Sequence, residues 1–391
     1  MSTTLFFYGS LCHIPLLEVV LGREQARIDI RKAHLPDHSV SWVKDEPFPM
    51  IAEKARCQAQ GILVQDLSDE DVVRLRFYEG GFDYDLKAVS VICNGDAITA
   101  EVFFPEAGLW SAGAEWNLQD WITQWGAVSL SAAREVMEHF GVKSAQEIAH
   151  LLPFFRARGW AKELAKTPRD LELRRETQSN EVTLQRRSDG YAGFFRLETF
   201  NISHPRFDNT QSETLDRAAF VAYDAALVLP YDPKRDLVLL IEQLRYGPVL
   251  RGDPQPWVLE PIAGLVDAGE APMEAARREA AEEAGLDLQD IRPMMNVYPS
   301  PGYSTEFFHC FLAVCDLDLG LEGVHGLQSE SEDIRTHVVS FDRAMELLDS
   351  GEINLGPLAM MLLWLGRHRE KIRSLGWSGP VGGQPPHPRG P

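Results

Sequence analysis

The sequence predicts a multidomain protein of mixed α/β and α+β class, with a strand-rich first domain, a short helical connector and a larger domain of strands and helices. Its 391 residues exceed the ~100–200 that one domain usually holds. Apolar residues recur at strand spacing early in the chain and at helical spacing over residues 114–168. We expect domains at residues 1–113 and 175–378, a helical connector at 114–174 and a disordered tail at 379–391.

The first domain is expected to consist of short strands joined by turns. TLFFYG, beginning at Thr4, is a compact apolar run, and ARCQAQGILVQ, beginning at Ala55, alternates in polarity. LKAVSVIC and AITAEVFF flank the turn Asn94-Gly95-Asp96, a pattern typical of a β-hairpin. The connector then shows three or four short helices by apolar spacing, and a charged stretch begins at Lys166.

The second domain alternates strands and helices. Its expected strands are apolar and β-branched: residues 218–232, 236–245, 257–266 and 307–317. The first two are joined by the turn DPKRD. Its last two expected helices, amphipathic or buried, are residues 341–351 and 355–372.

The composition excludes several classes of partner. Hydrophobic residues make up 45% and charged residues 25%, as in soluble globular proteins. The net charge of −20 argues against a nucleic-acid surface, which requires basic patches. The chain begins without a signal peptide, and its longest apolar run is about half of the ~20 residues that span a bilayer. The five scattered cysteines contain no CxxC pair, so we expect a cytoplasmic protein without disulfides, zinc or a membrane contact.

Residues 264–286, GLVDAGEAPMEAARREAAEEAGL, are the most informative segment. Pro272 suits the first position of a helix and Gly285 the residue just past its end, which predicts a helix over 272–284. One face of that helix is apolar and can pack on a sheet: Met273, Ala276, Ala280 and Ala284.

A second face of this helix carries Glu279, Glu282 and Glu283. Like charges three and four residues apart repel, so an isolated helix gains nothing from them. Carboxylates side by side can share a hard divalent cation such as Mg²⁺, and Arg278 can neutralise or orient its neighbours. A solvated acidic face is the usual meaning of a charge run, but it explains neither the glycines nor the arginine.

The segment matches the Nudix box at every specified position, from Gly264 and Glu270 through Arg278-Glu279 to Gly285. The resemblance covers about residues 185–375 and is closest to the bacterial ADP-ribose pyrophosphatase branch of the Nudix hydrolases. GFF (193–195), SPGYSTE and ESEDIRTHVVS all look like that branch. The resemblance implies an α/β/α sandwich that hydrolyses ADP-ribose to AMP and ribose 5-phosphate with Mg²⁺, or with Mn²⁺ in its place.

The resemblance also implies roles for individual residues. The implied metal ligands are the backbone carbonyl of Ala263 with Glu279, Glu283 and Glu332. Glu282 would be a further ligand or would lie next to the ligands, and Glu330 would be the general base. The implied substrate contacts are Phe194 or Phe195 on adenine, with Arg217, Arg245, Leu265, Ser300, Pro301, Gly302 and Glu306. The ordinary alternatives are solvated surface arginines, core phenylalanines and a flexible acidic turn. A homodimer that exchanges N-terminal strands is implied as well.

The first domain resembles the γ-glutamylcyclotransferase-like family, a small six-stranded barrel-like fold. LFFYGSLCHIPLLEVVLG and FYEGGFDYDL carry this resemblance. It implies that Tyr8-Gly9-Ser10-Leu11 offers backbone N–H groups to a substrate carboxylate and that Glu79 moves a proton between amines. The alternative is a catalytically silent domain that assists dimerisation or positions its neighbour.

Three other functions remain open. The substrate could be another nucleoside diphosphate sugar, the Nudix domain could bind ADP-ribose without cleaving it, or the first domain could carry the main chemistry. Two-domain chains of this kind also resemble proteobacterial proteins linked to tellurite resistance.

Overall fold

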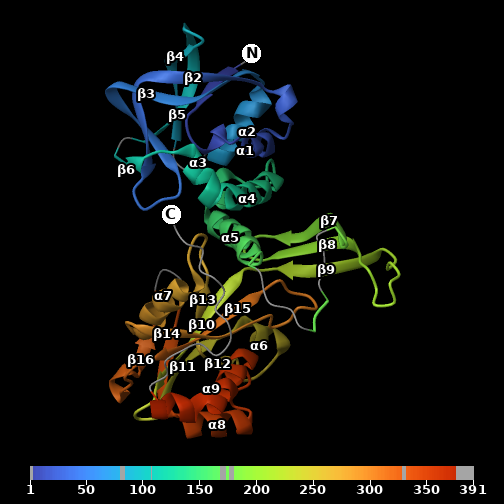
Figure 1. Cartoon of the computed structure of the whole chain (residues 1–391), viewed down its shortest axis with the longest axis vertical. Helices are drawn as coiled ribbons and strands as arrows, with labels where there is room; N and C mark the ends of the chain where they lie inside the picture. The colour runs from blue at the N-terminus through green and yellow to red at the C-terminus, as the bar shows by residue number, and fades with distance from the viewer. Residues whose placement is uncertain are drawn as a thin grey trace. The chain divides into compact units, whose positions relative to one another are not determined.

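The structure is a computed structural model that describes residues 3–79, 84–106, 108–167, 173–175, 180–327 and 332–375. Contacts divide the chain into two compact units, Met1–Glu163 and Leu164–Pro391 (Figure 1). The boundary falls inside the predicted connector. The expected tail and Glu330 lie outside the described residues. Within the described ranges, no helix is long and apolar enough to cross a membrane.

Five strands of the first unit close into a barrel. They are β1 (Thr3–Phe7), β2 (Asp29–Val43), β3 (Pro49–Leu67), β4 (Tyr84–Cys93) and β5 (Asp96–Pro105). Their order is β3-β1-β5-β4-β2, and β2 pairs with β3 to complete the ring, while β6 (Ala112–Glu115) extends β2. The expected hairpin is β4–β5, and Asn94 and Gly95 both adopt positive φ in its turn. The barrel interior is filled by apolar side chains such as Phe6, Leu63 and Val102.

Helices cover one side of this barrel. They are η1 (Ser10–Cys12), α1 (Ile14–Leu21), η2 (Gln25–Arg27), α2 (Asp69–Glu79), α3 (Leu118–Trp121), the π-helical η4 (Ile122–Gly126), α4 (Ala127–Glu138) and α5 (Ala145–Leu164). The helices expected between residues 114 and 168 are therefore present as α3 to α5. Trp121 and Ala133 pack in the same core as Leu16 and Leu75, so these helices belong structurally to the barrel unit.

The second unit contains two sheets. A three-stranded antiparallel sheet consists of β7 (Thr183–Ala192), β8 (Arg196–Ser203) and β9 (Leu215–Val221). The main sheet has the order β14 (Asp290–Val297), β15 (Phe307–Val314), β10 (Asp224–Asp232), β11 (Leu237–Leu244), β17 (Ile334–Ser340) and β16 (Gly323–His325). Two short strands flank it, β12 (Trp257–Glu260) beside β11 and β13 (Ile262–Leu265) beside β10.

Helices pack on both faces of the main sheet, which confirms the expected α/β/α sandwich. Leu227, Leu229 and Leu240 share a core with α8 (Phe341–Ser350) and α9 (Gly356–Leu375). Side chains alternate across a strand, so Ala226 and Val228 face the other way. On that side α7 (Pro272–Ala284) contacts β13 and β10. The short elements α6 (Tyr246–Arg251) and η5 (Leu319–Leu321) lie in connections.

The apolar face of α7 differs in detail from the sequence expectation. Ala276, Ala280 and Ala284 are buried as expected, but Met273 is only half-buried and Ala275 is buried instead. The helix therefore lies slightly rotated relative to the expected face. As a consequence Glu283, assigned to the ligand face, is pressed against the sheet.

Candidate active site

The ends of α7 are fixed by the residues that the sequence singled out. Pro272 occupies the first turn, and Gly285 ends the helix in the left-handed conformation at φ 63°. Its N–H donates to the carbonyl of Ala281 at 3.1 Å. The three glutamates therefore project from a helix that begins and ends at defined positions beside β13.

Glu283 is a buried carboxylate held by the backbone of β13. Its side chain accepts a hydrogen bond from the N–H of Ala263 at 3.0 Å, and the residue is only 2% exposed. Burial raises its pKa well above the ordinary value, and the charges of Glu279 and Glu332 raise it further. A carboxylate so placed stays ionised only if a positive charge compensates it.

Glu279 lies directly over Gly264 of β13. A Cβ added to Gly264 would stand 1.8 Å from Oε1 of Glu279, so any larger residue would displace this carboxylate from its place. Burial raises the pKa of Glu279 to about 7, with Glu282 and Glu332 adding to the shift and Arg278 opposing it. The glycine at position 264 thus has a steric reason in this chain.

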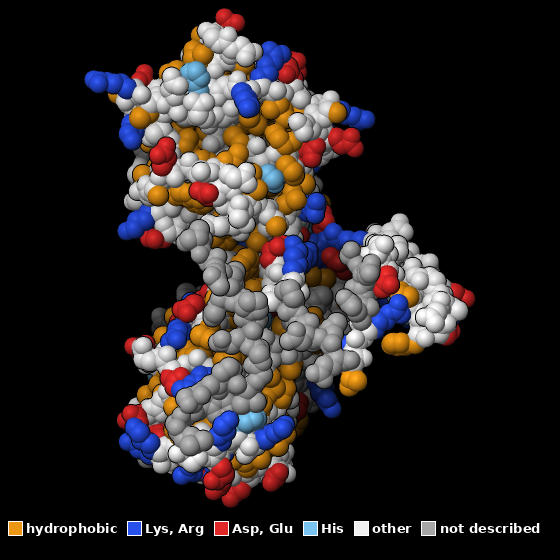
Figure 2. All heavy atoms as spheres, in the orientation of Figure 1, with side chains coloured by type: hydrophobic (Ala, Val, Ile, Leu, Met, Phe, Trp, Pro, Cys, Tyr) orange, Lys and Arg blue, Asp and Glu red, His pale blue; other side chains and the backbone are white. Residues whose placement is uncertain are grey.

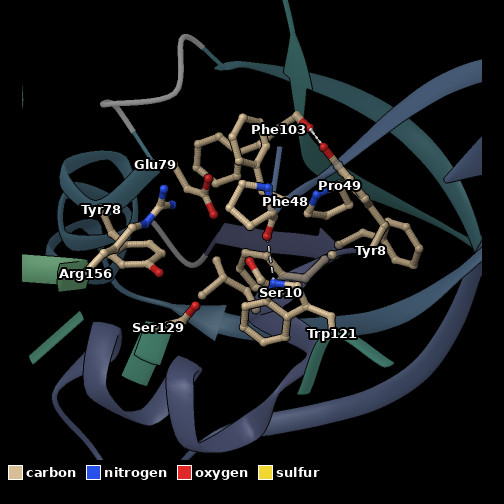
Figure 3. Close-up of a pocket in the computed structure, with 15 residues that line it drawn as sticks. Tyr8, Ser10, Phe48, Pro49, Tyr78, Glu79, Phe103, Trp121, Ser129 and Arg156 are labelled. Atoms are coloured by element: carbon tan, nitrogen blue, oxygen red, sulfur yellow. Dashed lines mark hydrogen bonds between the residues drawn. The ribbon is translucent and has the colours of Figure 1, made fainter. Parts of the chain in front are cut away.

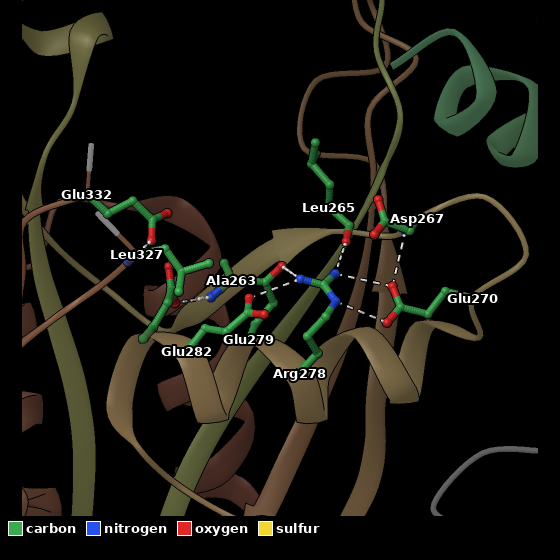
Figure 4. A network of polar contacts seen from close by, with 10 residues as sticks. Ala263, Leu265, Asp267, Glu270, Arg278, Glu279, Glu282, Leu327 and Glu332 are labelled. Carbon is green, nitrogen blue, oxygen red and sulfur yellow. Dashed lines mark hydrogen bonds and ion pairs between the residues drawn. The ribbon is translucent and has the colours of Figure 1, made fainter. Parts of the chain in front are cut away.

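Arg278 ties the helix to the preceding loop (Figure 4). Its guanidinium donates to Glu270 at 3.2 Å and to the carbonyl of Leu265 at 2.9 Å. It also donates to Glu279 at 2.6 Å and to Glu282 at 3.2 Å. The predicted neutralising and orienting roles of Arg278 both have a geometric basis here.

The donor set fits a hard divalent cation in its chemistry. In the described part of the chain, no three acidic, histidine or cysteine side chains stand close enough to hold a metal ion as they are placed. Glu332 accepts from the N–H of Leu327 at 3.1 Å, and its charge still raises the pKa of Glu279 and of Glu283. Carboxylate oxygens are the ligands that Mg²⁺ prefers, and the mutual repulsion of Glu279, Glu283 and Glu332 would be relieved by such a cation.

Arg245 lies at the edge of this carboxylate cluster. It precedes α6 and donates two hydrogen bonds to buried Glu260, at 2.7 and 2.6 Å. Burial raises the pKa of Glu306, and the charge of Arg245 opposes that shift. The structure therefore brings Arg245 and Glu306 into the same electrostatic neighbourhood as Glu283.

The predicted aromatic residues form a small cluster. Ring centroids of Phe194 and Phe195 lie 4.7 Å apart, and Tyr223 joins them at 5.8 and 6.4 Å. Tyr223 was not predicted as a site residue, because it lies in an apolar strand pattern that indicates core. The two phenylalanines are exposed enough to offer a ring face to a ligand.

The remaining predicted substrate residues lie on different elements of the second unit. Arg217 is exposed on β9 and donates to the carbonyl of Asp216 at 2.7 Å. Ser300, Pro301 and Gly302 form the turn before β15, where the Ser300 carbonyl accepts from Ser304 at 3.0 Å. Arg217 therefore belongs to the three-stranded sheet rather than to the groups around α7.

The first unit holds a pocket lined by residues of its barrel and of its helices (Figure 3). The predicted residues Tyr8, Gly9, Ser10, Leu11 and Glu79 all line it. The Tyr8 hydroxyl donates to the Phe103 carbonyl at 2.9 Å, which fixes that wall. Burial raises the pKa of Glu79 to about 7, a value that suits a group exchanging protons near neutral pH.

Among the lining residues that were not predicted from the sequence are Trp121, Ser129 and Arg156. They come from α3, α4 and α5, the helices interpreted as a connector. Helical periodicity shows that a segment has an apolar face, but it does not show which cavity that segment borders.

Comparisons with known proteins identify both domains. A NUDIX domain model matches residues 222–358, and a model described as γ-glutamyl cyclotransferase, AIG2-like, matches residues 5–122. An ADP-ribose pyrophosphatase of Escherichia coli (strain K12) is 36% identical over 195 residues, which is 50% of this chain and 92% of that protein.

Other relatives fall in the same range of similarity. An ADP-ribose pyrophosphatase of Haemophilus influenzae is 38% identical over 177 residues, 45% of this chain and 81% of that protein. A GDP-mannose pyrophosphatase of E. coli O9:H4 is 33% identical over 142 residues, 36% of this chain and 73% of that protein. The matched range includes the whole of residues 264–286. The chain therefore belongs to the Nudix family and carries, ahead of its Nudix domain, a domain of the γ-glutamyl cyclotransferase, AIG2-like type.

Proposed function

We propose that the second unit hydrolyses the pyrophosphate of ADP-ribose, giving AMP and ribose 5-phosphate, with Mg²⁺ as its metal. The observation that carries this proposal is a pair of carboxylates against β13 with raised pKa values, buried Glu283 and Glu279, whose side chain is 12% exposed. The names of the relatives, ADP-ribose pyrophosphatases, supply the substrate.

Glu279 and Glu283 would hold the metal, with Glu332 and the carbonyl of Ala263 as further ligands. Mg²⁺, when bound, offsets negative charge on the pyrophosphate and makes a water easier to deprotonate. The N–H of Ala263 orients Glu283, and Arg278 orients Glu279 and Glu282. Glu330 is the proposed general base, which would take the proton of the attacking water.

Arg245 is the proposed phosphate-binding group of the chain itself. A guanidinium held in a fixed plane by Glu260 can present its remaining N–H groups to a phosphate without losing side-chain entropy on binding. Glu306 lies near it and would accept from a ribose hydroxyl. Adenine would stack on Phe194 or Phe195, which Tyr223 supports.

We also propose that the second unit forms a homodimer through its three-stranded sheet. Apolar side chains are exposed on or beside this sheet, including Leu184, Tyr191, Phe220 and Phe207, the last at 92% exposure. Figure 2 shows hydrophobic side chains on the surface formed by β7 to β9. Such a patch favours a protein interface, and a second copy could bring Arg217 to a site. Mass measurement in solution tests this, and a monomer at micromolar concentration would contradict it.

A comparison of substrates tests the main proposal. Values of kcat/KM would be measured for ADP-ribose, ADP-glucose and GDP-mannose, each with Mg²⁺ and with Mn²⁺. We expect ADP-ribose to be preferred and to yield AMP. A preference for GDP-mannose would show that the substrate is another nucleoside diphosphate sugar rather than ADP-ribose. No turnover of any of the three compounds would favour a binding role.

A second candidate function belongs to the first unit, namely cyclisation of a γ-glutamyl amide with release of 5-oxoproline. Glu79, whose pKa burial raises to about 7, favours it because one carboxyl must both accept and donate a proton. Release of 5-oxoproline by the whole chain, lost in Glu79→Gln, is the expected result. A catalytically silent domain would release none.

A further inference from the structure

Two helices that lie beyond the residues matched by the cyclotransferase model border the first-unit pocket. The model matches residues 5–122, whereas Ser129 on α4 and Arg156 on α5 both line the cavity. In Figure 3, Arg156 lies beside Tyr78 and Glu79 at one side of the pocket, and Tyr8 and Pro49 lie at the other. The pocket therefore contains a cation that the barrel itself does not supply.

The backbone that carries Arg156 is fixed by close packing of α5 on α4. Gly159 approaches α4 so closely that an added Cβ would stand 3.1 Å from the carbonyl of Val128. One residue before it, Arg158 forms a buried ion pair with Glu135 at 2.8 Å. Phe155 packs in a core with Ala132 of α4. Arg156 is thus held in place between two structural residues of the same helix.

The guanidinium of Arg156 is suited to bind an anion. Burial lowers its pKa, while Tyr78 and Glu46 act in the opposite direction. Arg156 borders the pocket, and a guanidinium can make two parallel hydrogen bonds to a carboxylate or a phosphate. Arg134, on α4, is by contrast exposed to solvent.

We propose that Arg156 is a specificity-determining residue of the first-unit pocket, where it binds a carboxylate on the part of the ligand that lies next to Glu79. This inference rests on the second candidate function above. The family resemblance assigns the loop Tyr8-Gly9-Ser10-Leu11 to a substrate carboxylate, which we take as the α-carboxylate of the glutamyl group. Arg156 is then left to select a second anionic group.

The chemistry of the reaction indicates which group that is. The α-amine nitrogen attacks the γ-carbonyl carbon and forms the ring C–N bond, while the C–N bond to the departing amine breaks. Glu79 takes one proton from the attacking amine and returns it to the departing amine, so it is unchanged at the end. The departing amine therefore lies beside Glu79, and a carboxylate on that amine falls on the side of the pocket where Arg156 lies.

The test uses two ligands that differ by a single carboxylate, γ-glutamylalanine and γ-glutamylethylamide. Their dissociation constants would be measured by calorimetry with the full chain as wild type, Arg156→Met and the control Arg134→Met. We expect wild type and control to bind γ-glutamylalanine about tenfold or more tightly than the ethylamide. Arg156→Met should lose this preference by weakening only γ-glutamylalanine, with an unchanged melting temperature.

Each contrary result overturns the inference in a distinct way. Equal binding of both ligands to wild type, or a preference that persists in Arg156→Met, shows that Arg156 does not select the carboxylate. Equal weakening of both ligands with a lower melting temperature assigns Arg156 a structural role. Absence of binding by either ligand also removes the second candidate function, whereas 5-oxoproline release without preference for γ-glutamylalanine removes only the present inference.

Discussion

Replacing Gly264 by alanine is the sharpest perturbation that the structure suggests. A Cβ at this position would stand 1.9 Å from Cδ of Glu279, whereas ordinary van der Waals contact begins at 3.4 Å. The carboxylate must therefore withdraw by about 1.5 Å, the difference between the two. The backbone does not need to move, because the side chain of Glu279 can rotate away.

We expect Gly264→Ala to lower the catalytic rate more than the stability of the fold. Misplacement of a catalytic group by about 1 Å costs on the order of 10²-fold in rate, so we expect kcat for AMP release to fall by at least that factor. Crowding that a flexible side chain can relieve should cost no more than about 1–2 kcal/mol of unfolding free energy. Gly264→Ala should thus yield a folded protein with a much lower kcat for AMP release.

The assay is AMP release from ADP-ribose at saturating Mg²⁺, with thermal unfolding of the same samples. Gly356→Ala is the matched control, because a Cβ there meets nothing within 4 Å. The control should keep wild-type activity. Retention of more than half of the wild-type kcat by Gly264→Ala would refute the steric reasoning.

Two further predictions concern the first unit. Burial raises the pKa of Glu79 from 4.5 to about 7, so the stability that its protonated form contributes is present below pH 4.5 and is lost as the pH rises through 7. The free energy of unfolding of Glu79→Gln, measured with urea, should therefore exceed that of wild type by about 1–3 kcal/mol at pH 8 but by little at pH 5. An equal difference at both pH values would contradict the assigned pKa. Arg158→Leu removes the cation that compensates buried Glu135, so it should lower the free energy of unfolding by about 3–5 kcal/mol. Adding Glu135→Leu in the same chain should restore most of this loss. No recovery in the double variant would show that the loss has another cause.

Local patterns in the sequence predicted the parts of the fold that depend on neighbouring residues. Pro272 and Gly285 set both ends of α7, and Asn94-Gly95 set the turn between β4 and β5, because backbone preferences act over a few residues. The packing of segments that lie far apart in the chain was harder to predict from the sequence. Periodicity predicted an apolar face for α7, but the small rotation that buries Ala275 and Glu283 depends on the sheet beneath.

The site residues divide in the same way. The carboxylates of α7 could be found because they share one helix and their repulsion requires an explanation. Arg156 and Tyr223 could not be found, because the pocket of Arg156 and the aromatic cluster of Tyr223 are each assembled from segments far apart in the chain. Arg245 was identified through the family resemblance, and its bidentate bond to Glu260 emerges only when β12 pairs with β11.

The measurement that tests the central claim most directly compares AMP release from ADP-ribose and Mg²⁺ by wild type, Glu283→Gln and Glu274→Gln. Glu274 lies on the same helix but is exposed, so it controls for loss of one negative charge from α7. Gln at position 283 keeps the shape of the side chain and removes a buried charge, so the variant should be at least as stable as wild type.

We expect Glu283→Gln to lose about a hundredfold or more of the AMP release, while Glu274→Gln stays close to wild type. That result would make the carboxylate cluster of α7 the working site. AMP release by Glu283→Gln at the wild-type rate would contradict the account, because the reaction would then not depend on the charge that the structure places at its centre.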